Sequence, residues 1–490
     1  MRDVSPALGV PAVVVPDERS WAMWGQDLAA SGYVPAVSAE EAAAVWLPAE
    51  LPEPLAEPLM RLLHRVPAKA RTVTLPSPLT GRSTQDLLVV ATQREAGFSG
   101  NGDASPGAEM HGHQHSHGDG DAEHGAAAED GHEGDACSPG HHSADREHHR
   151  GHEDDGTSDE PWANNMMPIG GTPSRDGLVM EDVEVVLGPL GSPLPGGLVA
   201  EIGLDGEVVC RCELTRTLEV RAPEGRVWRA PDPLAPATWQ VAFDYAFEAA
   251  VGVRASEATR RQRVAAVEVE RALSHFVNLR ELGRVLGWQQ LIDAAARAVE
   301  TCGTARAAMS TESAAAQDEL AAARRQAEKL ASLLDGSRRL RWRTAGRALL
   351  TADRLSGIPG PVARAAGARV DARLGDSLYE ALGFELTTMD AGDAQARTVL
   401  SAIEARVALR LAATAVSEQG SGDETGPLSG CVESPRGPVQ VTAASPGWRG
   451  HAPGAGLLLE AVQEAVTGEV YSRALVGLVS FDLSPWRVPA

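Results

Sequence analysis

The chain has 490 residues, 43% of them hydrophobic, and a formal net charge of −23 from 44 Lys and Arg against 67 Asp and Glu. This length suffices for two or three domains with cores of their own, whereas the acidic balance argues against a protein that neutralises nucleic-acid phosphates. Residues 101–160 hold 16 acidic and two basic residues and so carry −14 of the charge, which leaves only −9 for the rest of the chain.

Cysteine use indicates a reducing compartment, and the hydropathy pattern predicts no membrane-spanning segment. The five cysteines are few and scattered for a chain of this length, which predicts no disulfide framework. The N-terminal residues make a poor signal peptide, and nowhere do 18 apolar residues follow one another without interruption. We therefore expect a cytoplasmic protein that contacts the inner face of the cell membrane only through partners.

Residues 1–98 have an ordinary globular composition and predict a small α+β module. The stretch SAEEAAAVWL at 38–47 resembles the capped start of a helix. Two β-rich runs follow, TVTL at 72–75 and LLVVAT at 87–92, and each predicts a strand. No motif in this module indicates what it binds.

Residues 99–162 consist mainly of Gly, Asp, Glu, Ser and His, and hold too few apolar residues to offset the entropy of ordering them. We expect a disordered acidic linker. Imidazoles at alternate positions beside carboxylates favour binding of Ni²⁺ or Zn²⁺, so both a metal buffer and a polar spacer of biased composition fit this segment. Eleven of the 14 histidines lie in it: His111, His113, His115, His117, His124, His132, His141, His142, His148, His149 and His152.

Residues 163–490 open on a predicted β-hairpin. The run VAEIGLDGEVVCRCEL (199–214) contains two strands that join at Asp205–Gly206, a dipeptide that favours a type I′ turn. Cys210 and Cys212 lie two residues apart on the second strand and therefore face the same side. They are either half of a metal site or, by default, buried or half-buried thiols.

Helical patterns dominate the remainder of this domain. The segments GPVQVT (437–442) and GLLLEAVQEAV (456–466) predict a strand and a helix. Two apolar stripes at helical spacing predict two longer helices: Ala316, Leu320, Ala323, Ala327, Leu330 and Leu334 in the first, and Val399, Ile403, Val407 and Leu411 in the second. The fold class expected for the chain is therefore α+β, mainly α-helical.

Six motif-bearing stretches follow one another through residues 163–490. The first, GPLGSPLPGGLVAEIGLDGEVV (188–209), is a Gly-Pro segment with the hairpin, and GDAQARTVLSAIEARVALR (392–410) is the fourth. The others carry charged or Gly-Pro motifs whose matched residues are Glu268, Arg271, Ser274 and His275 in 246–275, Gly360, Pro361, Arg364, Gly367, Asp371 and Arg373 in 343–373, Glu433 and Arg436 in VESPRG, and Asp482 in the terminal SFDL.

Together these stretches resemble one superfamily, the large subunit of NiFe hydrogenases and its descendant in respiratory complex I, the D-type (49 kDa) subunit of NADH-quinone oxidoreductase. The resemblance implies a hydrogenase-large-subunit fold that docks on an iron–sulfur small subunit and on membrane-arm subunits. Its nearest members would be formate-hydrogenlyase-like large subunits, in which residues 1–98 take the place of a domain that resembles the C-type subunit of complex I. Such a complex would use quinone and the partner's iron–sulfur cluster.

The sequence departs from this family at the family's functional positions. The resemblance places the four nickel-ligand cysteines at Asp232, Ala235, Ser484 and Arg487, where no thiolate is present to hold nickel and iron. The histidine-rich turn of the quinone site aligns with Gly191 and Pro195, and its tyrosine with Phe243, two residues before Tyr245. Phe cannot donate a hydrogen bond to a quinone carbonyl.

We therefore expect a subunit of a membrane-associated oxidoreductase complex that has no nickel–iron centre and is not catalytic alone. It would provide a quinone-site-like cavity beside the iron–sulfur partner. The retained charged residues would form a partly buried ion-pair network with an architectural role. They are Arg364, Asp371, Arg373, Glu433, Arg436 and Asp482. The alternative function is buffering or delivery of Ni or Zn through the His-rich segment.

Overall fold

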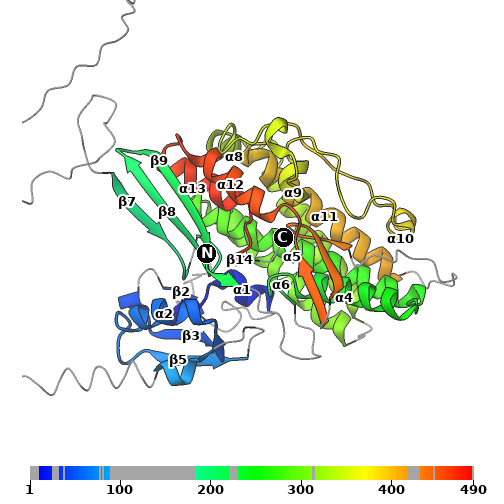
Figure 1. Ribbon diagram of the computed structural model, residues 1–490, viewed down its shortest axis with the longest axis horizontal. Helices are drawn as coiled ribbons and strands as arrows, with labels where there is room; N and C mark the ends of the chain where they lie inside the picture. The colour runs from blue at the N-terminus through cyan, green and yellow to red at the C-terminus, as the bar shows by residue number, and fades with distance from the viewer. Residues whose placement is uncertain are drawn as a thin grey trace, which may run out of the picture. The chain divides into compact units, whose positions relative to one another are not determined.

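The computed structural model describes residues 10–24, 33–36, 39–76, 79, 82–88, 182–191, 193–219, 230–311, 315–417, 431–444 and 447–487 (Figure 1). Helices predominate among them and the sheets are small, which confirms the predicted α+β class. Residues 1–96 and 171–490 cluster into one compact unit. The predicted linker at 99–162, with all of its histidines, lies outside the described residues.

The N-terminal part holds a four-stranded parallel sheet with the strand order β2-β1-β3-β5. The chain leaves β1 for β2 on one side and then crosses to β3 on the other, so the order reverses at β1. In open parallel sheets, ligands bind outside the carboxyl ends of the strands at such a reversal. The elements are β1 (Val10–Val14), α1 (Glu18–Met23), β2 (Tyr33–Pro35), β3 (Ala44–Pro48), α2 (Ala56–Leu63) and β5 (Arg71–Leu75).

Two predictions for this part were wrong. The stretch SAEEAAAVWL forms a short 3-10 turn, η1 (Ala39–Glu41), and then strand β3 instead of a helix. All five residues of β3 are buried, and pairing with β1 and β5 outweighs the helix propensity of the preceding alanines. The first two residues of LLVVAT, Leu87 and Leu88, are helical instead of extended, and residues 89–92 lie outside the described residues. TVTL lies in β5 as predicted. The remaining short elements are β4 (Glu50–Leu51), η2 (Glu53–Leu55) and β6 (Arg82–Ser83).

The predicted hairpin is the core of an antiparallel sheet of β7 (Val183–Leu187), β8 (Leu198–Asp205) and β9 (Val208–Arg216). Asp205 pairs with Val208, so the two turn residues are Gly206 and Glu207. Only Gly206 has a positive φ, 60°. The turn is therefore not the predicted type I′, and a glycine with positive φ at the first central position is typical of type II′.

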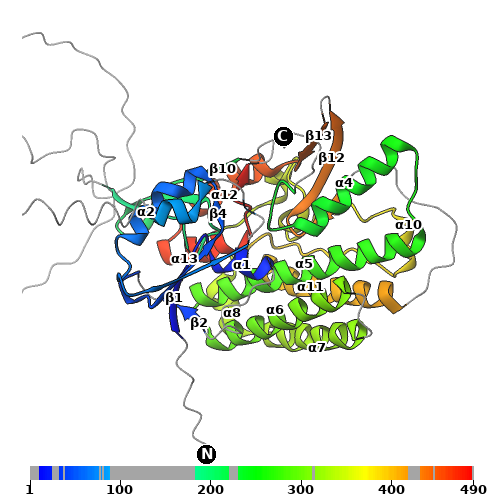
Figure 2. The same ribbon diagram turned by 90° about the horizontal axis from the view of Figure 1, so that it is seen from below.

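Four helices form a bundle in which α5 contacts α6 and α11, and α7 contacts the same two helices (Figure 2). They are α5 (Glu257–Val285), α6 (Gln289–Ser310), α7 (Ala316–Leu334) and α11 (Ala394–Ser417). Helix α7 has the predicted bounds, and all six residues of its apolar stripe are buried. Helix α5 is buried over most of its length, so its charged residues must find partners inside the protein.

The remaining elements surround the ends of this bundle. The predicted strand at 437–442 belongs to an antiparallel sheet of β11 (Cys431–Ser434), β12 (Gly437–Ala444) and β13 (Gly447–His451), and α12 (Ala455–Val466) matches the predicted helix. Further elements are β10 (Leu218–Glu219), α4 (Pro236–Val251), α8 (Arg338–Thr344), η4 (Ala352–Leu355), α9 (Gly360–Arg364), α10 (Ser377–Ala381), α13 (Tyr471–Ser480) and β14 (Trp486–Arg487). Among the described residues, none of the helices has the length and apolar character needed to cross a membrane.

Candidate functional site

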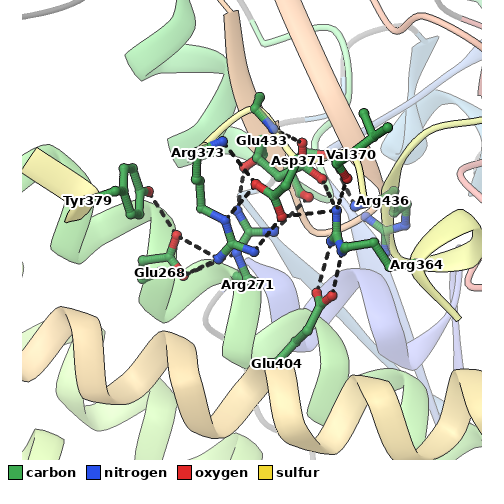
Figure 3. A network of polar contacts seen from close by, with 12 residues as sticks. Glu268, Arg271, Arg364, Val370, Asp371, Arg373, Tyr379, Glu404, Glu433 and Arg436 are labelled. Carbon is green, nitrogen blue, oxygen red and sulfur yellow. Dashed lines mark hydrogen bonds and ion pairs between the residues drawn. The ribbon is translucent and has the colours of Figure 1, made fainter. Parts of the chain in front are cut away.

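Three arginines and four carboxylates gather between α5, α11 and the segments around α9 and β11 (Figure 3). None of these residues is more than 7% exposed. Six of them were identified by the sequence motifs, and Glu404 is the addition. We call this set the arginine–carboxylate network: Glu268, Arg271, Arg364, Asp371, Arg373, Glu404 and Glu433.

Arg364 connects three of the four carboxylates. Its Nε and Nη2 donate to both oxygens of Glu404, at 2.8 and 3.1 Å. Its Nη1 donates to Glu433 Oε1 at 2.8 Å and lies 3.0 Å from Asp371 Oδ2. A lysine could not satisfy this arrangement, because only the planar guanidinium presents donors in two directions with fork geometry.

The other two arginines connect α5 to the rest of the network. Arg373 donates to both oxygens of Asp371 at 2.9 and 2.8 Å, and its Nη1 lies 3.2 Å from Glu268 Oε2. Arg271 donates to Glu268 at 3.1 Å and to the carbonyl of Ser434 at 2.9 Å. Tyr379 of α10 completes the shell, since its hydroxyl donates to Glu268 Oε1 at 2.8 Å.

The network has four carboxyl groups for three guanidinium groups, so one retained proton would make it neutral. Burial, and then the neighbouring Asp371 carboxylate, raise the pKa of Glu433. Burial also opposes ionisation of Glu404, yet Arg364 and His275 hold the pKa of Glu404 well below its usual value. Glu433 is therefore the group that takes up a proton more readily.

Gly360 and Pro361 position Arg364 at the end of the short helix α9. Gly360 has a φ of 83°, and a Cβ atom there would lie 2.8 Å from the carbonyl oxygen of Arg436 and from Gly437 Cα. Pro361 follows in the first turn of α9, where its missing N–H removes no helical hydrogen bond. Because the motif allows this close approach, Arg364 lies within reach of β11.

Arg436 and Asp482, predicted as members of the network, pair with each other and lie beside it. Arg436 Nε donates to the carbonyl of Asp482 at 3.0 Å, and Nη2 donates to Asp482 Oδ1 at 3.3 Å. Arg19 of α1 binds the same Oδ1 at 2.7 Å and also donates to Asn278 at 3.1 Å. Asp482 has a φ of 50°, a conformation that Asp adopts more readily than most residues. The N-terminal part thus contributes directly to this site.

A cavity of about 70 Å³ opens beside this pair, and we call it the Arg436 cavity. Three of the four positions aligned with nickel-ligand cysteines line it: Asp232, Ala235 and Ser484. Ser484 Oγ donates to Asp232 Oδ2 at 2.8 Å. The fourth position, Arg487, points elsewhere, since its side chain is 73% exposed and lies 3.6 Å from Glu219.

These donors do not fit a nickel–iron centre. Such a centre needs soft thiolate ligands, whereas Asp232 and Ser484 offer hard oxygen atoms that already bond to each other. Within the part of the chain that the structure describes, no group of three His, Cys, Asp or Glu side chains is arranged to hold a metal ion. His275 also lines the cavity, and its Nε2 lies 3.3 Å from Glu404, so it links the cavity to the network.

A second cavity of about 290 Å³ also borders the network, and we call it the Tyr245 cavity. Tyr245 lines it, together with Arg263 and the network residues Arg373 and Glu433. Burial raises the pKa of Tyr245, so the phenol keeps its proton at neutral pH. Arg263 lies over the Tyr245 ring, with its guanidinium carbon 5.3 Å from the ring centroid.

The other positions aligned with the quinone site lie elsewhere. Phe243 packs edge-on against Trp448, with ring centroids 5.2 Å apart, and does not line the Tyr245 cavity. Gly191 donates its N–H to the carbonyl of Pro16 at 2.9 Å, and neither it nor Pro195 lines either cavity. Among the described quinone-site equivalents, Tyr245 alone lines one of these two cavities.

The Cys210 and Cys212 pair shows no feature of a metal site. Cys210 is exposed and Cys212 is half-buried on β9. Burial raises the pKa of Cys212 to about 11, so the thiol stays protonated at neutral pH and is a poor metal ligand. The default prediction of buried or half-buried thiols is therefore confirmed for Cys212 and wrong for Cys210.

Sequence reasoning missed Glu404, Tyr379 and Arg19. Glu404 had a signal, because it interrupts the small apolar residues of α11 at a position where the helix is buried. Tyr379 and Arg19 had none, since their partners Glu268 and Asp482 lie 111 and 463 residues away in the sequence.

Comparisons with known proteins give a structural likeness and a family match. One chain from the structure of the membrane-bound sulfane sulfur reductase (MBS), an archaeal respiratory membrane complex, aligns with a TM-score of 0.52 and 17% identity over 62% of this chain and 97% of that chain. The two therefore share a fold. Residues 295–428 match the family of the 49 kDa subunit of respiratory-chain NADH dehydrogenase. This match confirms the resemblance that the sequence motifs predicted. A search of curated proteins found no match.

Proposed function

We propose that the chain is a subunit of a membrane-associated oxidoreductase complex, of the complex I or formate-hydrogenlyase-like type, without a nickel–iron centre of its own. One observation carries the proposal: Asp232, Ala235 and Ser484 converge on the Arg436 cavity beside an intact arginine–carboxylate network. The family match at 295–428 supports the class of complex. Such a scaffold keeps its buried ion pairs although the metal ligands are replaced. It is therefore suited to assembly with other subunits and to ligand binding.

The proposal includes a docking surface for an iron–sulfur small subunit and for membrane-arm subunits, on the inner face of the cell membrane. Its test is native purification of the full chain from solubilised membranes, with identification of co-purified subunits and metal analysis. We expect an iron–sulfur subunit and membrane subunits to co-elute, with iron but no stoichiometric nickel. A chain recovered alone from the soluble fraction would contradict the proposal, and stoichiometric nickel would contradict the missing centre.

The Tyr245 cavity supports a finer proposal, that it binds a quinone headgroup. Burial keeps the Tyr245 phenol protonated, so its proton can be donated to a quinone carbonyl. Val264 and Val267 give the cavity an apolar wall. In this role the chain binds and orients quinone, and electrons come from the partner's iron–sulfur cluster.

Calorimetry with a short-chain quinone tests this role on the purified complex. Tyr245→Phe removes one hydrogen bond and should weaken binding roughly 2- to 10-fold. Phe243→Leu is the matched control, because Phe243 is two residues away and does not line the cavity. Equal binding by all three proteins would exclude the Tyr245 cavity as the quinone site.

A second candidate function, buffering or delivery of Ni or Zn, rests on the eleven histidines in residues 99–162. Alternating imidazoles bind these ions without a preformed site. Titration of the full chain and of a 99–162 deletion with Ni²⁺ and Zn²⁺ tests whether this segment binds the two ions. Binding that persists unchanged after the deletion would end this candidate.

A further inference from the structure

The Arg436 cavity carries more positive than negative charge in its wall. Three guanidinium groups line it, those of Arg216, Arg397 and Arg436, against the two carboxylates of Asp232 and Asp482. Arg19 adds a fourth guanidinium group from outside the lining, through its 2.7 Å contact with Asp482 Oδ1. The wall itself therefore holds one guanidinium group more than it holds carboxylates, and the carboxylates of Asp393 and Glu270 act on Arg397 and Arg436 from outside the lining. A buried guanidinium group is unfavourable where one of its donors lacks an acceptor.

Among the described residues, two of these arginines donate to neutral groups only. Arg216 donates to the backbone carbonyls of Ser484 and Ala455, at 2.9 and 3.0 Å. Arg397 donates to the Ser480 hydroxyl at 3.0 Å and to two backbone carbonyls, each at 2.9 Å. These bonds fix the side chains but do not compensate their charges as a carboxylate would.

Arg436 presents a donor with no partner. Its Nη1 is buried and makes no hydrogen bond within the described residues, although Nε and Nη2 are both engaged. Asp482 Oδ1 is shared between Arg436 and Arg19, so this one carboxylate faces two guanidinium groups. A buried N–H on a charged group without an acceptor is costly, and a ligand oxygen would satisfy it.

Apart from His275 and four serines, the rest of the wall is apolar. Trp239, Pro359, Val362 and Leu483 line the cavity together with several further prolines. Its volume of about 70 Å³ is small, although one water needs only roughly 10–15 Å³ of such space. The cavity therefore has room for a ligand the size of a few water molecules. A largely apolar wall with one unpartnered charged donor favours an amphipathic anion over a fully hydrated inorganic one.

We propose that the Arg436 cavity is a binding site for a small monocarboxylate, whose carboxylate oxygen accepts a hydrogen bond from Arg436 Nη1 and whose short apolar part lies against Trp239 and Val362. The positions that a metal centre would require are thus converted into an anion site. This inference is independent of the proposed membership in a membrane complex, because an isolated full chain would bind the carboxylate equally well.

Calorimetry and thermal unfolding of the full chain with acetate, at constant ionic strength in chloride, test the proposal. We expect saturable binding of acetate and a rise in Tm that follows its concentration, with no comparable effect of phosphate. Arg436→Gln should weaken acetate binding at least about 10-fold, because a charge-assisted hydrogen bond is lost. Arg354→Gln, in an exposed pair with Glu464, is the control and should bind like wild type.

Should Arg436→Gln fail to fold, Ala235→Leu provides the decisive variant, because it fills the cavity from its wall without removing a charge. It should abolish acetate binding. Absence of saturable acetate binding, an equal response to phosphate, or unchanged affinity in Arg436→Gln or Ala235→Leu would each overturn the proposal.

Discussion

Arg364 depends on Glu404 for its bidentate partner, at 2.8 and 3.1 Å. Glu404→Gln leaves a buried guanidinium with weaker compensation, and we expect the free energy of unfolding to fall by about 3 kcal/mol. Urea denaturation with an unchanged m value measures this loss. Glu464→Gln, which breaks the exposed pair with Arg354, is the control and should cost less than about 1 kcal/mol. Equal losses in the two variants would show that the network does not stabilise the fold.

Glu433 predicts a pH dependence of stability with a definite sign. Its pKa is raised by burial and by Asp371, so between the unfolded value of about 4.3 and the folded value the native state binds more protons than the unfolded state. The contribution of Glu433 to the free energy of unfolding therefore decreases as pH rises through this interval. Glu404, with its lowered pKa, contributes stability that is present above about pH 4.3 and is lost as pH falls through its folded pKa.

Glu433→Gln removes the first of these effects. The unfolding free energy of the wild type minus that of this variant should decrease as pH rises from about 4.5 toward neutrality. Urea titrations at several pH values measure it. Glu464→Gln again serves as the control, because its exposed partner pair should give a small difference over the same range. If the difference in unfolding free energy between wild type and Glu433→Gln does not vary with pH, the raised pKa of Glu433 is contradicted.

Single residues were predictable where a motif marked them. Glu268, Arg271 and Arg364 were identified because their spacing matches a known pattern, and the structure brings them together. Tyr379 and Arg19 have no local signature, since a hydrogen-bond partner distant in sequence leaves no trace in the neighbouring residues. For the same reason, the sequence did not indicate that Arg487 would lie away from Asp232 and Ser484.

At the scale of elements, the junction between α9 and β12 depends on Gly360. A methyl group there would lie 2.8 Å from backbone atoms of Arg436 and Gly437, and the φ of 83° disfavours any side chain. Gly360→Ala should therefore lower the free energy of unfolding by at least about 2 kcal/mol. Gly252→Ala is the matched control, since Gly252 has a φ of 71° but open space around it. Thermal or urea unfolding measures the loss of unfolding free energy in both variants. Equal losses would contradict the role of the close contact at Gly360.

Elements with a strong internal pattern were predicted well. Helix α7 has the predicted ends because one apolar stripe continues from Ala316 to Leu334 against the bundle. Strand β3 was not, because the alanines at its start and before it favour a helix locally, whereas pairing with the neighbours β1 and β5 makes it a strand. The local sequence therefore predicts an element when its apolar periodicity is strong, and fails where pairing with neighbouring strands determines the conformation.

For the whole molecule, the contact between the N-terminal part and the bundle centres on α1. Arg19 binds Asp482 and Asn278, and Arg306 of α6 donates to the carbonyl of Met23. Arg19→Ala should increase amide hydrogen exchange in residues 15–24 by about 10-fold or more while leaving α7 unchanged, because a partly buried charge pair is lost. Arg65→Ala removes only an exposed pair with Glu40 and is the control. Identical exchange in both variants would contradict the role of Arg19.

The family resemblance predicted the helical bundle but not how the N-terminal sheet meets it. The motifs lie in residues 163–490, so they carry no information about residues 1–98. The parallel order β2-β1-β3-β5 brings the carboxyl end of β1, and with it Arg19, to Asp482. This arrangement required the three-dimensional structure, because strand order depends on crossover connections that composition does not reveal.

The pairing of Arg19 with Asp482 joins residues 463 positions apart on one polypeptide. An association within a single chain is a unimolecular step, governed by an effective concentration that dilution cannot lower and that is often in the millimolar range. Two separate subunits that met through the same ion pairs would dissociate at low abundance. This contact therefore persists however few copies of the protein a cell makes, and its occupancy needs no balanced synthesis of two partners.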